Sequence, residues 1–578
     1  MNYRKPQVQD YYGHRLVALF FLGFALYIFG RLFFLQILRH DHYLAVAARS
    51  HETSEQVEAE RGSIYFADSR TGESFPAAIN KTYYLVYAVP KSIPASAVVS
   101  TTNKLATILK FDEVKKSDLL EKLSEHASVY KVIEKKVSEE VANEIKKNNI
   151  NGIRFEEQKY RFYPEDSIGA SVLGFAQRNN AGELDGKYGI EGYFNKKLSG
   201  RAGYILGEKG AQGDWITLAE RTNIQAENGC DIYLTIDRAL QKYACDRLRQ
   251  GLKDYKAKSA SLVLMNPKTG AILAMCSLPD FDPNNYSQVD DLSVFNNTSV
   301  FVPYEPGSVF KTFTMGAGLD LGIVSPFTTY VDPCEMNING YKVRNAEQKC
   351  YGRQTMTQVL EKSINTGVVW VEERLGGDRF RNYVKKFGFG EKTGISLSQE
   401  MSGDISSLDK RGEIFGANGS FGQGLTATPL QLATAYSAVA NNGKLMKPYI
   451  VSEERYDDGH SEKSTPEVID LAISEGAARL LSGMLISVVD NHYFSAKIEN
   501  YYVAGKTGTA QIPEKGKYSL ERTNHTFAGF APATRPVFTL IVKYEEPELK
   551  WAEQTALPVF HDVMQFALNY YGIPGDKK

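Results

Sequence analysis

The stretch "YEPGSVFKTFTMGAGLDLG", from Tyr304 to Gly322, places a lysine three residues after a serine, where a helix is expected to begin. One helical turn would bring the Ser308 hydroxyl and the Lys311 amine to the same face. The pattern is common by itself. The chain holds two more copies, Ser128 with Lys131 and Ser407 with Lys410. Other residues must therefore decide whether this pair carries chemistry.

A serine hydroxyl becomes a useful nucleophile only when a base within about 2.6 to 3.2 Å removes its proton. Lysine is a base only when uncharged, and at its ordinary pKa near 10.4 roughly one lysine in 2,500 is neutral at pH 7. Burial or a second cation must therefore lower the pKa of the lysine. A working Ser-Lys pair thus predicts another positive group nearby.

The stretch "VAGKTGTAQ", from Val503 to Gln511, supplies a candidate for that cation in Lys506. The two other copies of Lys-Thr-Gly, at Lys268 and Lys392, lie in a predicted hairpin turn and in a Gly-rich link, and we expect both to be structural. In the third copy, alternation along an extended segment points Lys506 and Gly508 to one side and Thr507 and Thr509 to the other. Its glycines would let a substrate backbone approach the strand.

A third element, "EKSINTGVVWVEERLGG", carries the Ser-x-Asn pattern of Ser363 and Asn365 between two helical runs. A short loop there could point both side chains into a cleft. The alternative is that Ser363 only caps the following helix.

Composition excludes some classes of function. The 578 residues predict about three or four structural units. The 67 Lys and Arg residues balance 68 Asp and Glu residues without a basic tract, which argues against a nucleic-acid surface. The histidines are scattered outside the motifs above, and we expect His525 to be a sheet-edge residue rather than a base.

The five cysteines show no metal-type spacing. Cys334 and Cys350 flank a predicted hairpin with an Asn-Gly turn, so a bridge between them is feasible outside the cell. Unpaired buried thiols are the alternative, and both stay open.

The N-terminal region predicts a membrane anchor. Residues 1–15 would form a cytoplasmic tail, and the apolar run over residues 16–38 is long enough to cross about 30 Å of hydrocarbon. Arg4, Lys5 and Arg15 precede the run, which by the positive-inside rule leaves everything after it outside the cytoplasm. The alternative is a signal peptide cleaved near Ala45–Ala47. Either way, the bulk of the chain is expected to be extracytoplasmic.

Beyond the anchor, we expect a mixed α/β pedestal over residues 40–225 and a catalytic domain over residues 226–575. The pedestal combines strands such as Thr82–Pro90 with charged helices such as Ser138–Lys147. The catalytic region begins and ends with predicted hairpins and is mostly helical between them. This order predicts an α+β domain whose sheet joins its two ends.

Taken together, Ser308-x-x-Lys311, Ser363-x-Asn365 and Lys506-Thr507-Gly508-Thr509 resemble the motif triplet of penicillin-binding proteins and serine β-lactamases. Ile364 stands where the β-lactamase pattern has Asp, which favours class B penicillin-binding proteins. Other stretches are also similar to that class, and they extend the resemblance to nearly the whole chain: "ERGSIYF", "RFYPEDSIGASVLGFAQ", "GIEGYFNKKLSGRAG" and "SFGQGLTATPLQLATAYSAVANNGKLMKPYIV".

The resemblance implies an antiparallel sheet with helices on both faces, a helical subdomain and a dimerisation-like pedestal. It also implies four catalytic residues: Ser308 as the acylated nucleophile, Lys311 as its base, Ser363 as a proton relay and Lys506 as the cation that keeps Lys311 neutral.

The resemblance further implies a substrate-binding set. Asn365 would hold the peptide backbone of the substrate, and Thr507 and Thr509, separated by Gly508, would bind its terminal carboxylate. The backbone N–H groups of Ser308 and Thr509 would form an oxyanion hole.

The implied activity is that of a peptidoglycan D,D-transpeptidase that cross-links D-Ala-D-Ala stem peptides, is inhibited by β-lactams and requires no metal or cofactor. Implied partners are the cytoplasmic membrane, a membrane glycosyltransferase and proteins of a division or elongation complex. The compact pedestal and the ending "FHDVMQFALNYYGIP" are similar to the cell-division branch. The alternatives are an elongation-type transpeptidase, a D,D-carboxypeptidase or β-lactamase-like hydrolase, and a non-catalytic β-lactam-binding scaffold.

Overall fold

The computed structural model describes residues 11–34, 53–179, 182–207, 222–514 and 517–577. Its first helix, α1, spans Tyr11–Phe33. No helix in these ranges is both long and apolar enough to cross a membrane. The predicted anchor over residues 16–38 runs on into residues 35–38, and the alternative cleavage site at Ala45–Ala47 also lies outside the described residues. The anchor stays a prediction.

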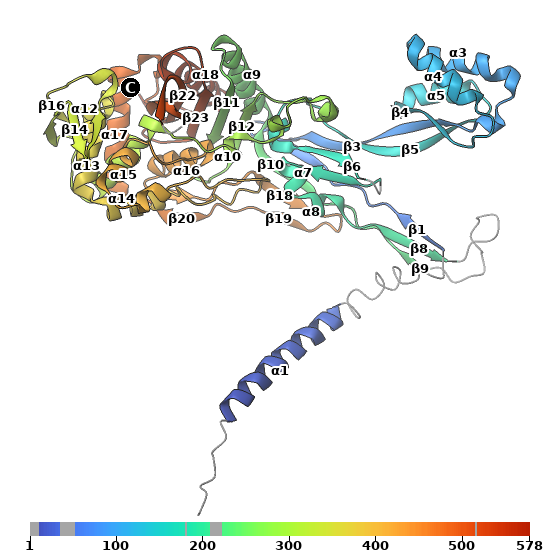
Figure 1. The fold of residues 1–578 in the computed structure, drawn as a ribbon, viewed down its shortest axis with the longest axis horizontal. Coiled ribbons are helices and arrows are strands. Elements are labelled where there is room, and N and C mark those ends of the chain that lie inside the picture. The colour runs from blue at the N-terminus through green and yellow to red at the C-terminus, as the bar shows by residue number, and fades with distance from the viewer. Residues whose placement is uncertain (1–10, 35–52, 180–181, 208–221, 515–516, 578) are drawn as a thin grey trace, which may run out of the picture. The chain divides into compact units, whose positions relative to one another are not determined.

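The chain forms two compact units (Figure 1). The first comprises residues 1–61 and 199–229, and it contains α1 and an antiparallel sheet in the order β1–β8–β9. The bounds of these strands are Thr53–Val57, Gly203–Gly207 and Thr222–Ile224. The second unit comprises residues 62–198 and 230–578. The predicted pedestal over residues 40–225 therefore contributes to both units.

Within the second unit, strands β2 to β5 of the pedestal segment share a sheet with β10, β18 and β19 of the catalytic region, in the order β19–β18–β10–β2–β3–β4, with β5 also paired to β3. The predicted strand Thr82–Pro90 corresponds to the second half of the 15-residue strand β3, which ends two residues earlier, at Ala88. The predicted charged helix is α5, capped by the Ser138 hydroxyl, which accepts a hydrogen bond from the Val141 N–H. The bounds are β2 Ile64–Ala67, β3 Ser74–Ala88, β4 Lys131–Val137, β5 Ile153–Phe162, β10 Asp231–Asp237, β18 Val451–Arg455, β19 Ser461–Lys463, α3 Val98–Ile108, α4 Glu113–Ser124 and α5 Glu139–Lys147.

A buried ion pair joins two of the pedestal stretches singled out in the sequence. Arg161 Nε donates to Glu191 Oε1 at 2.6 Å, and the two side chains are 1% and 0% exposed. The Tyr163 hydroxyl donates to the same oxygen at 3.3 Å. Arg161 lies on β5 and Glu191 in α7, one of five short elements of this segment: α6 Ala170–Leu173, β6 Phe175–Arg178, β7 Leu184–Lys187, α7 Gly189–Tyr193 and α8 Asn195–Ser199. Opposite charges therefore compensate each other where the segments "RFYPED" and "GIEGYF" meet.

The catalytic region contains an antiparallel sheet in the order β12–β11–β23–β22–β21. Strands β11 and β12 come from its beginning, and β21, β22 and β23 come from its end, so the prediction that a sheet joins the two ends is confirmed. Figure 1 shows the green β11 beside the red β23. The bounds are β11 Ser259–Met265, β12 Ile272–Leu278, β21 Ala504–Glu514, β22 Lys517–Ala531 and β23 Phe538–Glu545.

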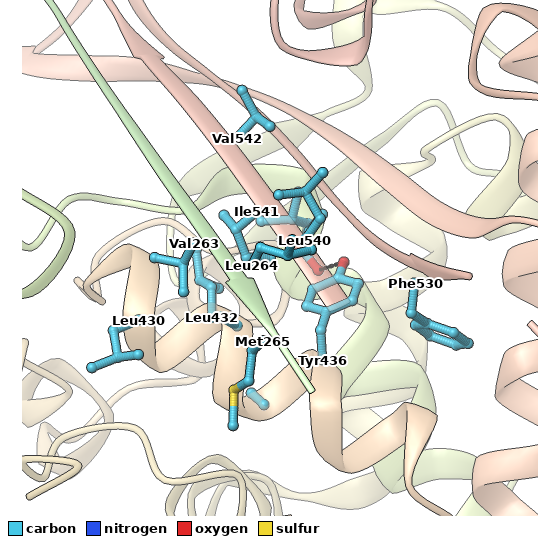
Figure 2. Packing of buried hydrophobic residues seen from close by; sticks show 14 of the residues in the cluster. Val263, Leu264, Met265, Leu430, Leu432, Tyr436, Phe530, Leu540, Ile541 and Val542 are labelled. Atoms are coloured by element: carbon cyan, nitrogen blue, oxygen red, sulfur yellow. Dashed lines mark hydrogen bonds between the residues drawn. The ribbon is translucent and has the colours of Figure 1, made fainter. Parts of the chain in front are cut away.

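Helices cover both faces of this sheet. Tyr544 and Phe527 reach one face, where they contact α9 (Arg238–Asp254) and α18 (Ala556–Tyr570): the Tyr544 hydroxyl donates to the Leu248 carbonyl, and the Phe527 ring lies 4.5 Å from that of Phe560. Their strand neighbours point to the opposite face, which packs against α16 (Pro429–Ala440). Figure 2 shows this packing of β11, β23 and α16 around Val263, Ile541 and Tyr436.

The helical subdomain lies between β12 and β21 in the sequence. Its predicted helix start at Pro429 is confirmed, with Thr428 and Gln431 forming a capping box. The bounds are α10 Thr298–Phe301, α11 Lys311–Asp320, β13 Thr329–Val331, β14 Glu335–Ile338, β15 Tyr341–Arg344, β16 Arg353–Thr355, α12 Met356–Glu361, α13 Asn365–Leu375, α14 Gly377–Lys386, α15 Glu413–Ser420, β17 Lys444–Met446, β20 Val468–Leu471 and α17 Glu475–His492.

All five cysteines lie in the described residues. Cys334 and Cys350 are bridged across the β14–β15 hairpin, which is the first of the two alternatives left open by the sequence. A second bridge, Cys245–Cys276, joins α9 to β12 and was not anticipated. Cys230 is buried and unpaired.

Candidate active site

The nucleophile candidate Ser308 lies in a 3₁₀ turn, η7 (Gly307–Phe310), that leads directly into α11. The Gly307 N–H donates to the Gly422 carbonyl at 3.0 Å. A β-carbon at position 422 would lie 2.3 Å from the Gly307 carbonyl oxygen, so only glycine permits this approach. The loop that follows α15 therefore fixes the backbone of the turn that carries Ser308.

Tyr436 of α16 also forms a hydrogen bond with the turn that carries Ser308. Its hydroxyl donates to the Val309 carbonyl at 2.8 Å and is hydrogen-bonded to the Thr312 hydroxyl at 2.9 Å. Tyr436 is fully buried. The stretch "LATAYSAV", singled out by resemblance alone, thus has a structural task, which is to tie α16 to the Ser308 turn and to the start of α11.

Lys311 is 0% exposed, and its amine points to the second motif. Lys311 Nζ donates to the Ser363 hydroxyl at 3.1 Å and to the Ser363 carbonyl at 2.5 Å. Ser363 has a φ of +54°, a left-handed conformation that costs free energy in a residue other than glycine. This backbone conformation presents the hydroxyl and the carbonyl of one residue to the same amine.

The third motif, on β21, packs directly against the Ser308 turn. A β-carbon at Gly508 would lie 2.8 Å from the Pro306 carbonyl oxygen and 3.3 Å from the Val309 nitrogen. The bare α-carbon is therefore required for this contact. Lys506, two residues earlier, is 0% exposed.

The two buried lysines interact electrostatically. Burial lowers the pKa of Lys311 well below its ordinary value, and the charge of Lys506 lowers it further. Burial also lowers the pKa of Lys506, to about 8, against the opposing effect of the Glu553 carboxylate. The second cation that the sequence argument demanded is therefore close enough to act on Lys311.

The remaining candidate residues already have partners in the chain. The Asn365 amide donates to the Arg344 carbonyl at 2.8 Å, and the Thr507 hydroxyl donates to the Tyr493 hydroxyl at 2.7 Å. Thr509 Oγ1 accepts a hydrogen bond from the Ala552 N–H at 3.2 Å. The N-terminus of α13, where Asn365 lies, is held by Asn345, whose side-chain oxygen accepts from the Thr366 N–H.

The sequence interpretation missed two residues at this site, Tyr493 and Glu553. Tyr493 follows α17, and its hydroxyl accepts hydrogen bonds from both Lys506 and Thr507. The predicted alternation along β21 therefore does not keep these two polar groups apart. Glu553 belongs to the short turn η11 (Ala552–Gln554), which touches β21 through Thr509. Neither residue lies in a recognisable motif.

The prediction for His525 is wrong in its location. His525 lies on β22, which has β21 on one side and β23 on the other, and it is 0% exposed. Its ring nitrogens are hydrogen-bonded to Thr523 and Thr555. Burial lowers its pKa to about 4, so the ring is neutral at pH 7. The hairpin that contains it is longer than the sequence pattern indicated, so the position falls inside the sheet.

The other copies of the short motifs have local partners. Lys131 forms an ion pair with Glu125, and Lys410 lies over the Phe415 ring. Lys268 lies in the turn between β11 and β12, as expected, where its N–H is bound by Asn266. Thr393, in the copy at Lys392, donates to Glu400.

Comparison with known proteins agrees with this fold and site. Residues 260–565 match the penicillin-binding protein transpeptidase domain, and residues 56–234 match the penicillin-binding protein dimerisation domain. The chain is 33% identical to stage V sporulation protein D of Bacillus subtilis, over 96% of this chain and 86% of that protein. It is 27% identical to peptidoglycan D,D-transpeptidase FtsI of Escherichia coli, over 95% of this chain and 90% of that protein.

Solved structures show the same architecture. Penicillin-binding protein 2X of Streptococcus thermophilus superposes with a TM-score of 0.76 at 24% identity, over 89% of this chain and 80% of that one. Penicillin-binding protein 3 of Mycobacterium tuberculosis, complexed with ampicillin, gives a TM-score of 0.68 at 25% identity, over 91% and 98%. The chain belongs to the penicillin-binding protein family. Within it, the chain is a class B member with a dimerisation domain and a transpeptidase domain.

Proposed function

We propose that Ser308 is the acylated nucleophile with which this transpeptidase cross-links peptidoglycan stem peptides, and that Lys311 is its base. The observation that carries this proposal is the state of Lys311. Its amine is fully buried, has a pKa far below the ordinary value because of burial and the nearby Lys506, and is already bonded to Ser363. An uncharged lysine one helical turn from a serine is the base that the chemistry requires.

In the acylation step, Ser308 Oγ attacks the carbonyl carbon of the penultimate D-Ala while Lys311 takes the hydroxyl proton. Collapse of the tetrahedral intermediate breaks the bond to the terminal D-Ala nitrogen. The proton travels from Lys311 through the Ser363 hydroxyl, 3.1 Å away, to that leaving amine. The backbone N–H groups of Ser308 and Thr509 stabilise the oxyanion.

In the second step, the amine of a neighbouring stem attacks the Ser308 ester, and its proton returns by way of Lys311 to Ser308. Asn365 holds the peptide backbone, and the substrate carboxylate is bound by the charge of Lys506 and by Thr507 and Thr509, with Gly508 giving the strand room to approach. The single O–H of Thr507, which is donated to Tyr493 in the substrate-free site, turns to the carboxylate when the substrate binds. Because the Lys506 ammonium and the substrate carboxylate have opposite charges, binding of the donor also favours the charged form of Lys506.

We also propose where in the cell the protein is located. Residues 16–38 anchor it in the cytoplasmic membrane, with residues 1–15 inside and the catalytic domain outside. The apolar side chains of α1, such as Phe20, Phe21 and Phe29, are 61 to 72% exposed within the chain, which supports burial in lipid. A membrane glycosyltransferase and proteins of a division complex are the expected partners, and septal wall synthesis is the expected role.

The test is labelling of the purified full chain with a fluorescent penicillin, followed by mapping of the modified peptide. We expect one label on the peptide that contains Ser308, and no label on Ser308→Ala. Ser407→Ala, in a second Ser-x-x-Lys copy, is the matched control and should label normally. Labelling of Ser308→Ala would contradict the proposal. A burst of acylation with slow release supports the transpeptidase, whereas sustained β-lactam turnover would instead indicate a hydrolase.

A further inference from the structure

The hydroxyl of Tyr493 is the meeting point of two groups of the third motif. Lys506 Nζ donates to it at 3.2 Å, and Thr507 Oγ1 donates to it at 2.7 Å. The side chains of neighbouring residues on a strand leave on opposite sides. A single oxygen nevertheless receives both, so it fixes their polar ends relative to each other.

The tyrosine itself is held firmly. It follows the last residue of α17, its N–H donates to the Val489 carbonyl, and its side chain is buried with an exposure of 7%. The ring stands edge-on to Phe527 of β22 at 6.3 Å, and Lys506 Nζ lies 5.4 Å from the ring centre. The hydroxyl oxygen therefore has a fixed position between α17 and the sheet.

We propose that Tyr493 is a positioning residue of the transpeptidase site, whose hydroxyl oxygen orients the Lys506 ammonium and the Thr507 hydroxyl toward the Ser308 turn. This inference rests on the proposed function for the tasks of Lys506 and Thr507. Tyr493 needs no contact with the reacting atoms, because it acts through these two residues.

The hydrogen bond to Tyr493 limits the directions in which the Lys506 ammonium can donate. An ammonium has three N–H groups, and the described hydrogen bonds use two of them, on the Tyr493 hydroxyl and on the Thr507 carbonyl. With two N–H directions fixed, the third is fixed as well. In the proposed function, it is the one that meets the carboxylate of the substrate.

The same hydrogen bond acts on the charge of Lys506. Burial disfavours the ammonium, whereas an oxygen that accepts its proton favours it. The charge on Lys506 in turn repels a proton from Lys311. In the proposed function, the Tyr493 oxygen thus favours the charged form of Lys506, and that charge favours the neutral form of Lys311. The other titratable groups that interact with Tyr493 or Lys506 are Glu553, His492, Tyr351 and Tyr436.

The experiment compares the full-length wild type with Tyr493→Phe, which keeps the ring and removes the hydroxyl. The rate constant of acylation by a fluorescent penicillin is measured from pH 6 to pH 10. Because a charged donor loses its acceptor, we expect the alkaline limb of the profile to move by about one pH unit toward lower pH, with an acylation rate about fivefold lower at pH 8.

Tyr544→Phe is the matched control, because Tyr544 is also buried but its hydroxyl forms its hydrogen bond elsewhere, donating to the Leu248 carbonyl of α9. We expect its melting temperature to fall while its pH profile stays that of the wild type. A Tyr493→Phe profile with an unshifted alkaline limb would overturn the inference, whatever its melting temperature. If the wild type itself were not acylated at Ser308, the proposed function would fail instead, and the two failures are therefore distinct.

A second measurement covers the case in which Tyr493→Phe folds poorly. In Thr507→Val, the Thr507 donor is lost but the tyrosine stays. If Tyr493 positions both groups, the effects of Tyr493→Phe and Thr507→Val on acylation are coupled, and the double variant loses less than the product of the two single losses. Independent effects would overturn the shared role of the hydroxyl.

Discussion

The pedestal and the active site both bury charged side chains, but they combine the charges in opposite ways. In the pedestal, Arg161 and Glu191 are almost completely buried and neutralise each other at 2.6 Å. In the active site, Lys311 and Lys506 are equally buried but carry the same potential charge. Both members of the pedestal pair can stay charged, because their charges are opposite. Lys311 and Lys506 cannot both be charged without a large cost in free energy.

The difference shows how burial serves two purposes. When one partner of a buried pair of opposite charges is removed, the other charge stays buried alone and the fold loses stability. Such a pair therefore fixes how two segments pack together. A like-charge pair in a dry environment instead lowers the affinity for a proton, which converts an ordinary lysine into a base. The predictions below test each half of this comparison, in order of decreasing effect.

Lys311→Met should give the largest effect, because it removes the proposed base. We expect acylation of Ser308 by penicillin to fall by about a thousandfold or more, measured by stopped-flow or gel-based labelling. Stability should not fall, because the variant no longer buries an amine. Lys410→Met, in a second Ser-x-x-Lys copy, is the control and should acylate at the wild-type rate. Near-normal acylation of Lys311→Met would contradict the role of Lys311.

Glu191→Gln should lower stability but leave acylation unchanged, the reverse of Lys311→Met. It leaves the Arg161 charge buried without its carboxylate, so we expect a loss of about 3 kcal/mol or more in the free energy of unfolding of the second unit. The acylation rate of the folded protein should stay normal. Replacing both residues by apolar ones, Arg161→Met with Glu191→Leu, should recover most of the stability. A double variant as unstable as the single one would show that the charge is not the cause.

The pH dependence of stability tests the buried amines directly. The pKa of Lys506 is lowered to about 8 in the folded state, against about 10.4 in the unfolded chain. Between these values the unfolded state binds more protons, so stability rises with pH. We expect wild-type stability to rise relative to Lys506→Met between pH 8 and pH 10, by up to about 1.4 kcal/mol per pH unit. If the stabilities of the wild type and Lys506→Met changed with pH in parallel, Lys506 would keep its ordinary pKa.

Arg247→Met should give the smallest effect. Arg247 and Asp562 form an ion pair at 2.7 Å between α9 and α18, but their side chains are 23% and 35% exposed. Water screens such a pair, so we expect a loss below about 1 kcal/mol in denaturant unfolding and no change in acylation. A loss as large as that of Glu191→Gln would show that burial does not separate the two kinds of ion pair.

Much of the local structure was predictable because the decisive residues lie close together in the sequence. The caps of α5 and α16 and the hairpin between β11 and β12 follow from hydrogen bonds or turns within a few residues. The order of the three motifs was also readable, because each is a short pattern. These features required no knowledge of what packs against them.

Other features depended on contacts between distant segments. The location of His525 inside the sheet, the bridge between Cys245 and Cys276, and the meeting of Lys506 and Thr507 on Tyr493 each involve elements that no local pattern connects. The left-handed conformation of Ser363 is a similar case, since an isolated serine would avoid it.

The sequence by itself determined which groups could take part in the chemistry: one serine with a lysine a turn away, a second serine, and a further lysine on a strand. It also required that some cation lower the pKa of the first lysine. Only the tertiary structure decided that Lys506, the candidate for this cation, lies close enough to lower the pKa of Lys311, that both amines are buried, and that Tyr493 accepts a hydrogen bond from one of them. The physical reason is that a lysine loses its proton through the exclusion of water and the nearness of another charge, and both arise only when segments far apart in the chain pack together.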